Sequence, residues 1–312
     1  MAYLEQNNKH LITDLITRKE FYWYKKWDKQ TNKYDEIIPR FLLDDAISKN
    51  ANLRLSSYQM FVQNYINPNT PYKRLLMKWQ TGGGKTIGAL SIAMNFIKTY
   101  KLEHEIGTAE IGTVFIIGFS ERIFKKTLLS FPEFGFLSRV EKNKLENIKK
   151  IATTGSKIDL ERYQEMIKKI KKRFSNRKSN GFLKFFGYRE FVNRIFISNS
   201  ELNINDLSED EIFNALNKGT IKYNEELLAQ FKNSLIICDE IHNVYNSLEK
   251  NNWGVALQFV LDKEPSCRAV FASATPLNNS PAEIVDLLNL LIPKENSLSR
   301  LSRNDFFINE NK

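Results

Sequence analysis

The most specific chemistry in the sequence lies in Thr81-Gly82-Gly83-Gly84-Lys85-Thr86. An apolar run, Leu75–Met77, precedes this segment, and an apolar-periodic segment, Ile87–Ile97, follows it. A strand, a glycine-rich turn and a helix in this order form a phosphate-binding loop, because glycines let backbone N–H groups approach phosphate oxygens and the helix N-terminus adds partial positive charge. In such a loop Lys85 reaches the β- and γ-phosphates, and the hydroxyl of Thr86 holds Mg²⁺.

The pattern departs from its full form at Trp79, where G-x-x-x-x-G-K-[ST] has its first glycine. The half of the pattern that contacts phosphate is intact. The alternative interpretation is a glycine-rich turn that precedes a lysine by chance, and the segments described next argue against it. We therefore predict a nucleoside triphosphate with Mg²⁺ as the ligand.

Two carboxylates follow a second apolar strand. Ser234–Cys238 is predicted to be buried, and Asp239-Glu240-Ile241-His242 comes directly after it. Ligands of open α/β sheets bind at the carboxyl ends of the strands, so these carboxylates belong beside the phosphate loop. Asp239 would coordinate the metal, and Glu240 would orient and deprotonate the water that attacks the γ-phosphate. The alternative is a solvated strand end with an acidic turn, which the phosphate loop upstream makes the weaker interpretation.

A third strand, Ala269–Ala272, ends in Ser273-Ala274-Thr275-Pro276. In this order, the three segments resemble the Walker A, DExH and SAT motifs of superfamily 2 helicases. Asp239–Asn243 and Ser273–Asn279 look like the branch found in large DNA viruses, which includes poxvirus nucleoside triphosphatase I and the small subunit of the poxvirus early transcription factor.

This resemblance implies a RecA-like domain that uses ATP and Mg²⁺ to act on nucleic acid. It assigns a coupling role, between the nucleotide and the grip on nucleic acid, to Ser273, Ala274 and Thr275. His242 would either sense the γ-phosphate near a domain interface or serve as a capping residue without a role in turnover. The segment Val114–Ser120 falls where the family has its Ia motif, which touches the nucleic-acid backbone.

Upstream, Leu55–Gln59 is similar to the segment that reads adenine in such enzymes. The amide of Gln59 carries both a donor and an acceptor and could pair with the adenine edge. An equally good interpretation is a helix start, with Ser56 or Ser57 as N-cap and Gln59 inside the first turn.

Composition and charge narrow the class further. The chain has 312 residues, of which 42% are hydrophobic, and this is enough to bury a full α/β core. We find no apolar run near the roughly 18 residues needed to cross a membrane and no N-terminal signal core, so we expect a soluble, intracellular protein, in the host cytoplasm or the virion if it is viral. Its 2 cysteines and 3 histidines predict neither a zinc site nor a disulfide framework.

The net charge of +10 is concentrated in one basic stretch without acids. Such a stretch favours a phosphate backbone as partner, and a solvated helix face is the alternative. An aromatic run at 21–27 could stack on bases, although packing of the N-terminal segment onto its domain is the favoured interpretation. The tentative nucleic-acid residues are Lys168, Lys169, Lys171, Lys172, Arg173, Arg177 and Lys178.

The elements that must position these residues are predicted as alternating strands and helices, which is typical of a doubly wound parallel sheet. We expect core strands at 73–79, 113–118, 194–197, 234–238 and 269–273. Helices are expected at 54–66, 85–100, 209–216 and 281–291, and a basic helical insertion at about 140–185. The expected domains are an N-terminal extension at 1–50, the ATP-binding domain at 51–300, and a tail at 301–312 that leads to an absent second domain.

The functional prediction is the ATP-binding domain of an ATP-dependent helicase or translocase in viral transcription or genome handling. Residues 276–312 are too few for another α/β domain, which takes on the order of 100 residues, so we expect a first domain that hydrolyses ATP slowly and does not unwind duplexes alone. A second RecA-like domain, in cis or in trans, and a viral RNA polymerase are the expected partners. The alternatives are a non-motor transcription or assembly factor that uses ATP structurally, and a restriction-type DNA translocase subunit.

Overall fold

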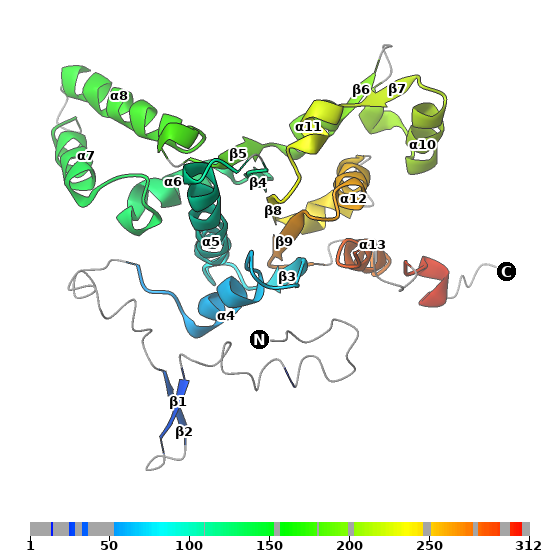
Figure 1. Ribbon diagram of the computed structural model, residues 1–312, viewed down its shortest axis with the longest axis horizontal. Helices are drawn as coiled ribbons and strands as arrows, with labels where there is room; N and C mark the ends of the chain where they lie inside the picture. The colour runs from blue at the N-terminus through cyan, green and yellow to red at the C-terminus, as the bar shows by residue number, and fades with distance from the viewer. Residues whose placement is uncertain are drawn as a thin grey trace. The chain divides into compact units, whose positions relative to one another are not determined.

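The computed structural model describes residues 14, 25–28, 33–36, 53–108, 110–152, 157–179, 181–198, 203–245, 251–276, 280–293 and 300–307 (Figure 1). The chain divides into two compact units. The first unit comprises Met1–Tyr72, Thr86–Phe96 and Phe124–Phe174, and the second comprises Lys73–Lys85, Ile97–Ile123 and Ser175–Lys312.

A five-stranded sheet organises the second unit, in the order β3-β9-β8-β4-β5. Every neighbouring pair of strands is parallel. This confirms the predicted α/β fold with a parallel sheet. The strands are β3 (Arg74–Lys78), β9 (Arg268–Ser273), β8 (Leu235–Asp239), β4 (Val114–Ile117) and β5 (Leu183–Phe186).

The central strands β4 and β8 are apolar along their whole length because both faces of the sheet are covered. On one face Phe115 and Ile236 belong to the core that also contains α9, α12 and α13. On the other face Ile116 and Ile237 are also buried. Continuous apolar runs of this kind are typical of buried parallel strands, so the sequence pattern and the fold agree.

One predicted core strand is wrong. Residues 194–197 do not join the central sheet, because α9 (Tyr188–Ile195) occupies the first part of this range and β6 (Phe196–Ser198) pairs antiparallel with β7 (Ile221–Tyr223). The fifth strand is instead β5, which lies within the range predicted as the insertion.

The physical reason is that β5 is an edge strand, and edge strands tolerate charge. Lys184, in the middle of β5, follows a basic stretch and makes its strand look polar in sequence. In the structure its ammonium group lies over the ring of Phe115, 5.9 Å from the ring centroid, and hydrogen-bonds to Gln230.

The predicted helices are present with shifted ends. The helix after the phosphate loop, α5, is longer than predicted (Lys85–Glu105), and α4 (Ser57–Tyr65) is shorter. Ser208 and Glu211 form a reciprocal capping box at the start of α10 (Glu209–Asn217), in which Ser208 N–H donates to Glu211 Oε2 at 2.7 Å. Besides α9 and α10, the second unit contains α11 (Glu225–Ala229), α12 (Trp253–Lys263) and α13 (Glu283–Asn289).

The first unit is mainly helical. Beside α4 it contains most of α6 (Glu121–Ser130) and the pair α7 (Arg139–Ala152) and α8 (Lys157–Arg173), which pack against each other within the range predicted as a helical insertion. A two-stranded antiparallel sheet joins β1 (Lys25–Asp28) to β2 (Lys33–Glu36). The side chains of the aromatic run at 21–27 lie outside the described residues.

An ion pair joins the start of α7 to the end of α8. Arg173 donates to both carboxylate oxygens of Glu141, at 2.7 and 3.1 Å, and also to the carbonyl of Phe136. The hydrogen bond from Arg173 is the main cause that lowers the pKa of Glu141 to about 2, and the backbone N–H of Ser138 adds to it. Bidentate pairs of this geometry are the stronger kind of surface ion pair.

Replacing Glu141 with glutamine is expected to destabilise the α7–α8 pair by about 0.5–1 kcal/mol at pH 7, since the pair is partly exposed to solvent. The folded-state pKa is lowered from 4.5, so the carboxylate stabilises the fold fully above pH 4.5 and loses this effect as the pH falls through about 2. Urea unfolding at several pH values measures the difference. Glu146→Gln is the control, because its longer pair with Lys142 (3.9 Å) is more exposed and its loss should be nearly neutral.

Candidate functional site

The glycine-rich loop lies between the end of β3 at Lys78 and the start of α5 at Lys85. Gly82 and Gly84 have φ of 81° and 77°, in the left-handed region that glycine adopts without strain. Gly83 N–H donates to the carbonyl of Gln80 at 2.9 Å and closes the turn. The long helix α5 begins directly after this turn, so its N-terminal backbone N–H groups end the loop.

Trp79, the residue in place of the first glycine, takes part through its backbone. Its N–H donates to the carbonyl of Ser273 at 3.1 Å, and its own carbonyl accepts a hydrogen bond from Lys85 Nζ at 3.3 Å. The first contact extends the pairing of β3 with β9 by one residue beyond β3. Although Trp79 replaces the first glycine of the pattern, its backbone carbonyl still holds the side chain of Lys85 in place.

The acidic segment follows β8. Asp239 is the last residue of the strand and is 6% exposed, and its carbonyl accepts a hydrogen bond from the hydroxyl of Tyr188 at 2.8 Å. Glu240 adopts a left-handed backbone with φ of 52°, uncommon for a residue with a side chain. Asn243 stabilises this turn, because both its backbone N–H and its side-chain amide donate to the carbonyl of Glu240 at 3.1 Å.

Side chains from the three motifs meet at this edge of the sheet. Lys85 Nζ lies 3.8 Å from Glu240 Oε1, and His242 Nδ1 lies 3.4 Å from Glu240 Oε2. His242 Nδ1 is also in hydrogen-bond contact with Ser273 Oγ at 2.8 Å, and Ser273 Oγ accepts the backbone N–H of Thr275 at 3.1 Å. The three segments follow β3, β8 and β9, which are adjacent in the sheet, and this explains how residues distant in sequence come together.

The predicted metal ligands are Thr86, the second residue of α5, and Asp239. Within the described ranges, no group of three or more His, Cys, Asp or Glu residues could hold a metal ion. A hydroxyl and a carboxylate are each donors of the kind that Mg²⁺ accepts, since proteins usually bind this ion through one or two side chains together with phosphate oxygens and water rather than in an all-protein cage.

Gln59 acts as a helix-start residue. Its amide oxygen accepts the backbone N–H of Ser56 at 2.9 Å, in the first turn of α4, and the side chain is buried. The structure therefore agrees with the interpretation of this segment as a helix start. The adenine-reading role stays a prediction.

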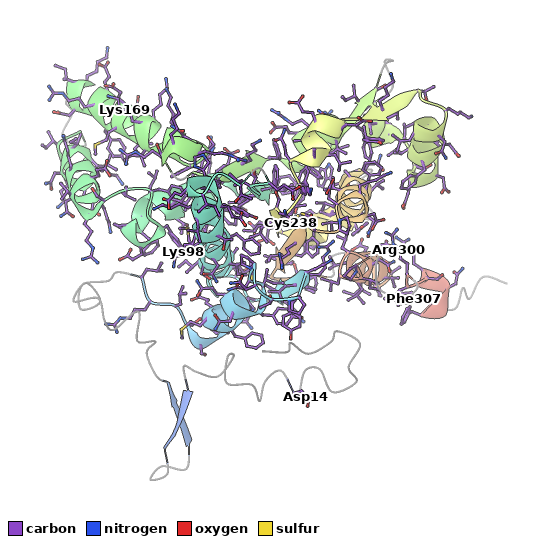
Figure 2. All side chains as sticks on the ribbon, in the orientation of Figure 1. Asp14, Lys98, Lys169, Cys238, Arg300 and Phe307 are labelled. Carbon is purple, nitrogen blue, oxygen red and sulfur yellow. The ribbon has the colours of Figure 1, made fainter. Side chains whose placement is uncertain are left out.

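The tentative nucleic-acid residues fall into different settings. Lys168, Lys169, Lys171 and Lys172 are exposed on α8 of the first unit (Figure 2), whereas Ile170 is 1% exposed and faces inward. Lys169 pairs with Glu165 of the same helix at 2.9 Å, and both side chains are exposed. Arg173 is instead held by both carboxylate oxygens of Glu141, so we leave it out of the nucleic-acid proposal below. In the second unit, Arg177 and Lys178 lie in a short 3₁₀ turn, with the guanidinium of Arg177 5.7 Å from the ring centroid of Phe182.

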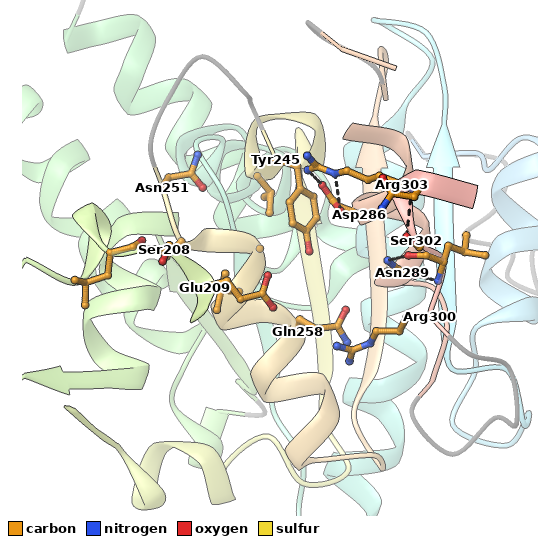
Figure 3. A pocket seen from close by; sticks show the side chains of 17 residues that line it. Ser208, Glu209, Tyr245, Asn251, Gln258, Asp286, Asn289, Arg300, Ser302 and Arg303 are labelled. Atoms are coloured by element: carbon orange, nitrogen blue, oxygen red, sulfur yellow. Dashed lines mark hydrogen bonds and ion pairs between the residues drawn. The ribbon is translucent and has the colours of Figure 1, made fainter. Parts of the chain in front are cut away.

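A polar pocket of about 890 Å³ lies elsewhere in the second unit (Figure 3). It is lined by residues of α10, α12, α13 and the segment 300–304, and by Val244 and Tyr245 just beyond His242. Arg303 pairs with Asp286 across the lining, and the side-chain amide of Asn289 forms two hydrogen bonds with the backbone of Leu301. None of the predicted site residues lines it.

Sequence analysis did not identify Tyr188, whose hydroxyl holds the carbonyl of Asp239. Its only sequence signal is a tyrosine that follows Gly187 at the start of a helix, and such a signal is unspecific. No helix of the described residues has the length and apolarity needed to cross a membrane.

Comparison with known proteins places this site in a family. The family model "Type III restriction enzyme, res subunit" matches residues 52–278, which is more than half of the chain and includes all three motifs. The chain belongs to this family. The assignment to a helicase-type family was expected from the three motifs and is confirmed.

The relatives of this chain include proteins of large DNA viruses. "Early transcription factor large subunit homolog" of African swine fever virus (isolate Tick/Malawi/Lil 20-1/1983) is 39% identical over 271 residues, which cover 78% of this chain and 24% of the relative. "Putative ATP-dependent RNA helicase L377" of Acanthamoeba polyphaga mimivirus is 26% identical over 312 residues, covering 96% of this chain and 24% of the relative. "Putative helicase 087L" of Invertebrate iridescent virus 3 is 26% identical over 257 residues.

These relatives confirm the resemblance to the branch found in large DNA viruses. The African swine fever virus proteins carry the name of a large subunit, whereas the motifs had suggested a small subunit as one similar protein. The chain spans about a quarter of the length of these relatives, 24% for the first.

Proposed function

We propose that this chain is the ATP-binding domain of an ATP-dependent nucleic-acid helicase or translocase that acts in the transcription or genome handling of a large DNA virus. The observation that carries the proposal is the meeting of Lys85, Glu240 and the His242–Ser273 pair at one edge of a parallel sheet. Their residue types are those that hydrolysis of a triphosphate requires.

The contacts of each side chain support the roles that we propose. The Lys85 ammonium would hold the β- and γ-phosphates, and its partly exposed contact with Glu240 is weak enough to be exchanged for phosphate. Glu240, with its carboxylate 32% exposed, would orient the attacking water and accept its proton. Mg²⁺, held by Thr86 and Asp239, would neutralise charge on the phosphates.

His242 and Ser273 would transmit the state of the nucleotide. The imidazole touches the carboxylate of Glu240 on one side and the hydroxyl of Ser273 on the other. Ser273 is also joined to the phosphate loop, because its carbonyl accepts the N–H of Trp79. A shift of Glu240 during hydrolysis would therefore reach the segment Ser273–Thr275, which supports the coupling role proposed for it.

Two alternative functions are weaker. A scaffold that uses ATP structurally has no chemical need for a carboxylate at Glu240, and here that carboxylate lies beside the lysine. A restriction-type DNA translocase subunit fits the family description, whereas the relatives reported above are named for viral transcription and helicase functions. We further propose the virion or host cytoplasm as the compartment, and a second RecA-like domain and a viral RNA polymerase as partners.

Equilibrium binding of ATP with Mg²⁺ and steady-state hydrolysis, each with and without an oligonucleotide, test the proposal in the complete protein. We expect binding that requires Mg²⁺ and hydrolysis that nucleic acid accelerates. ATP binding without any hydrolysis in the presence of nucleic acid would favour the structural alternative.

The exposed lysines of α8 are proposed as a second contact for the nucleic-acid backbone. Replacing Lys168, Lys169, Lys171 and Lys172 with alanine is expected to weaken binding and to reduce the slope of log K against log salt by up to about 2.8–3.6, since each phosphate contact contributes about 0.7–0.9. Filter binding across a salt series measures this slope.

The matched control removes the same number of exposed lysines from other helices and strands, at Lys98, Lys101, Lys218 and Lys222. An equal loss of slope in both variants would mean that only the total charge matters and that α8 provides no specific contact.

A further inference from the structure

An exposed aromatic ring stands at the carboxyl edge of the sheet, beside the acidic segment. Phe119 comes two residues after the end of β4 and is 61% exposed. Its ring makes edge contacts with Tyr188 and Trp253, with centroids 5.5 Å away and interplanar angles of 65° and 67°. These two rings stack on each other at 5.2 Å and 12°. Two other rings therefore fix the orientation of an aromatic side chain that faces solvent.

This ring is connected to the backbone that positions Glu240. Gly118, the residue before Phe119, has φ of 149°, and a Cβ placed on it would lie 2.9 Å from the carbonyl oxygen of Asp239. The hydroxyl of Tyr188 donates to the same oxygen at 2.8 Å.

We propose that Phe119 is a stacking site for an unpaired nucleobase and that Tyr188 relays its occupancy to the Asp239–Glu240 peptide. This inference rests on the proposed function and names the part of the substrate that the site reads: a base of a single strand. A base supplies the flat apolar face that a fixed and exposed ring can cover, and such stacking accepts any base.

Two exposed arginines, close in sequence to Phe119 and Tyr188, also favour a nucleic acid over an apolar protein segment. Arg122, in the first turn of α6, and Arg189, next to Tyr188, are exposed and form no ion pair within the part of the chain that the structure describes. Glu190, the acid that follows Arg189, is already paired with Arg194 at 2.8 Å. If a base stacks on Phe119, Arg122 and Arg189 are therefore available to bind the phosphates on either side of that base.

The test compares four substitutions of Phe119 by the anisotropy of a labelled thymidine oligonucleotide, without nucleotide. Loss of one stacked base is expected to raise Kd about 5- to 150-fold in Phe119→Ala and also in Phe119→Leu, which keeps apolar bulk without a π-face. Phe119→Tyr and Phe119→Trp should bind within about threefold of the parent. Binding of a blunt duplex, whose bases are already stacked, should not respond to any of the four.

Parent-like oligonucleotide binding by Phe119→Leu would show that no π-face is required and would overturn the stacking proposal. Parent-like binding by Phe119→Ala would show that the ring makes no contact with the oligonucleotide. Near-UV circular dichroism checks that each variant folds. The leucine variant keeps apolar packing against Tyr188 and Trp253, so a loss of binding in it is not due to an unpacked cluster. Because ATP binding is measured separately, a parent that binds ATP but not the oligonucleotide would sink this inference and leave the nucleotide site standing.

The relay has its own readout. Tyr188→Phe keeps all three rings and removes the hydrogen bond to Asp239, so the oligonucleotide Kd should be unchanged. The kcat of oligonucleotide-stimulated hydrolysis should fall about 3- to 10-fold, in line with the loss of one positioning hydrogen bond, with KM for ATP unchanged. An unchanged kcat would restrict Tyr188 to a packing role.

Discussion

Glu240→Gln is expected to stop ATP hydrolysis while leaving ATP binding intact. Glutamine keeps the size and the hydrogen-bonding oxygen of the side chain but cannot accept a proton from the attacking water. Loss of a general base typically lowers kcat by about 10²–10⁴-fold. The amide also removes the negative charge 3.8 Å from Lys85, so the lysine remains free to hold phosphate and the Kd for ATP should be equal to or below that of the parent.

Steady-state hydrolysis and equilibrium binding of ATP, measured in parallel on the complete protein, test this separation. Glu226→Gln is the matched control, because this glutamate is exposed in α11, outside the site, and its loss should change neither quantity. If Glu240→Gln loses binding and hydrolysis to the same extent, Glu240 serves the architecture of the site and the assignment as a base is wrong.

Lys85→Ala is expected to remove ATP binding itself. The ammonium group is the only side-chain cation of the segment Thr81–Thr86, and a charge-assisted contact to phosphate contributes about 1.5–3 kcal/mol. We therefore expect Kd for ATP to rise about 10- to 150-fold, and hydrolysis at ordinary ATP concentrations to be lost with it.

Lys98→Ala supplies the control on the same helix, since Lys98 is exposed on α5 far along from the loop (Figure 2). Isothermal titration with ATP and Mg²⁺ distinguishes the two variants. Binding of Lys85→Ala at the strength of the parent would mean that the glycine-rich turn does not cradle phosphate, and both the nucleotide site and the proposed function would fail.

The sequence was sufficient for the strands that carry the motifs. Ser234–Cys238 and Ala269–Ala272 are buried on both faces, and this burial leaves a continuous apolar run that can be recognised without a structure. The glycines and carboxylates that follow such runs then fall at one edge of the sheet. For this reason the contacts of Lys85, Glu240 and Ser273 could be anticipated in kind, although not their partners and distances.

Other features depend on contacts that no local pattern records. Lys184 makes the edge strand β5 look like part of the basic insertion, because an edge strand needs fewer apolar residues than a central one. In sequence, Arg173 is one more cation of the basic stretch, and nothing near it indicates its bidentate contact with Glu141, which is distant in sequence. Tyr188, at the start of α9, is joined to Asp239, at the end of β8, by a hydrogen bond between residues distant in sequence, and its sequence neighbours give no sign of this role.

Trp79 has a consequence for how such proteins are found. Both hydrogen bonds that it contributes to the loop, one to Ser273 and one from Lys85, use atoms that every residue except proline possesses. These two contacts therefore do not require a particular side chain at this position. A pattern search that requires glycine there will therefore miss chains with this loop.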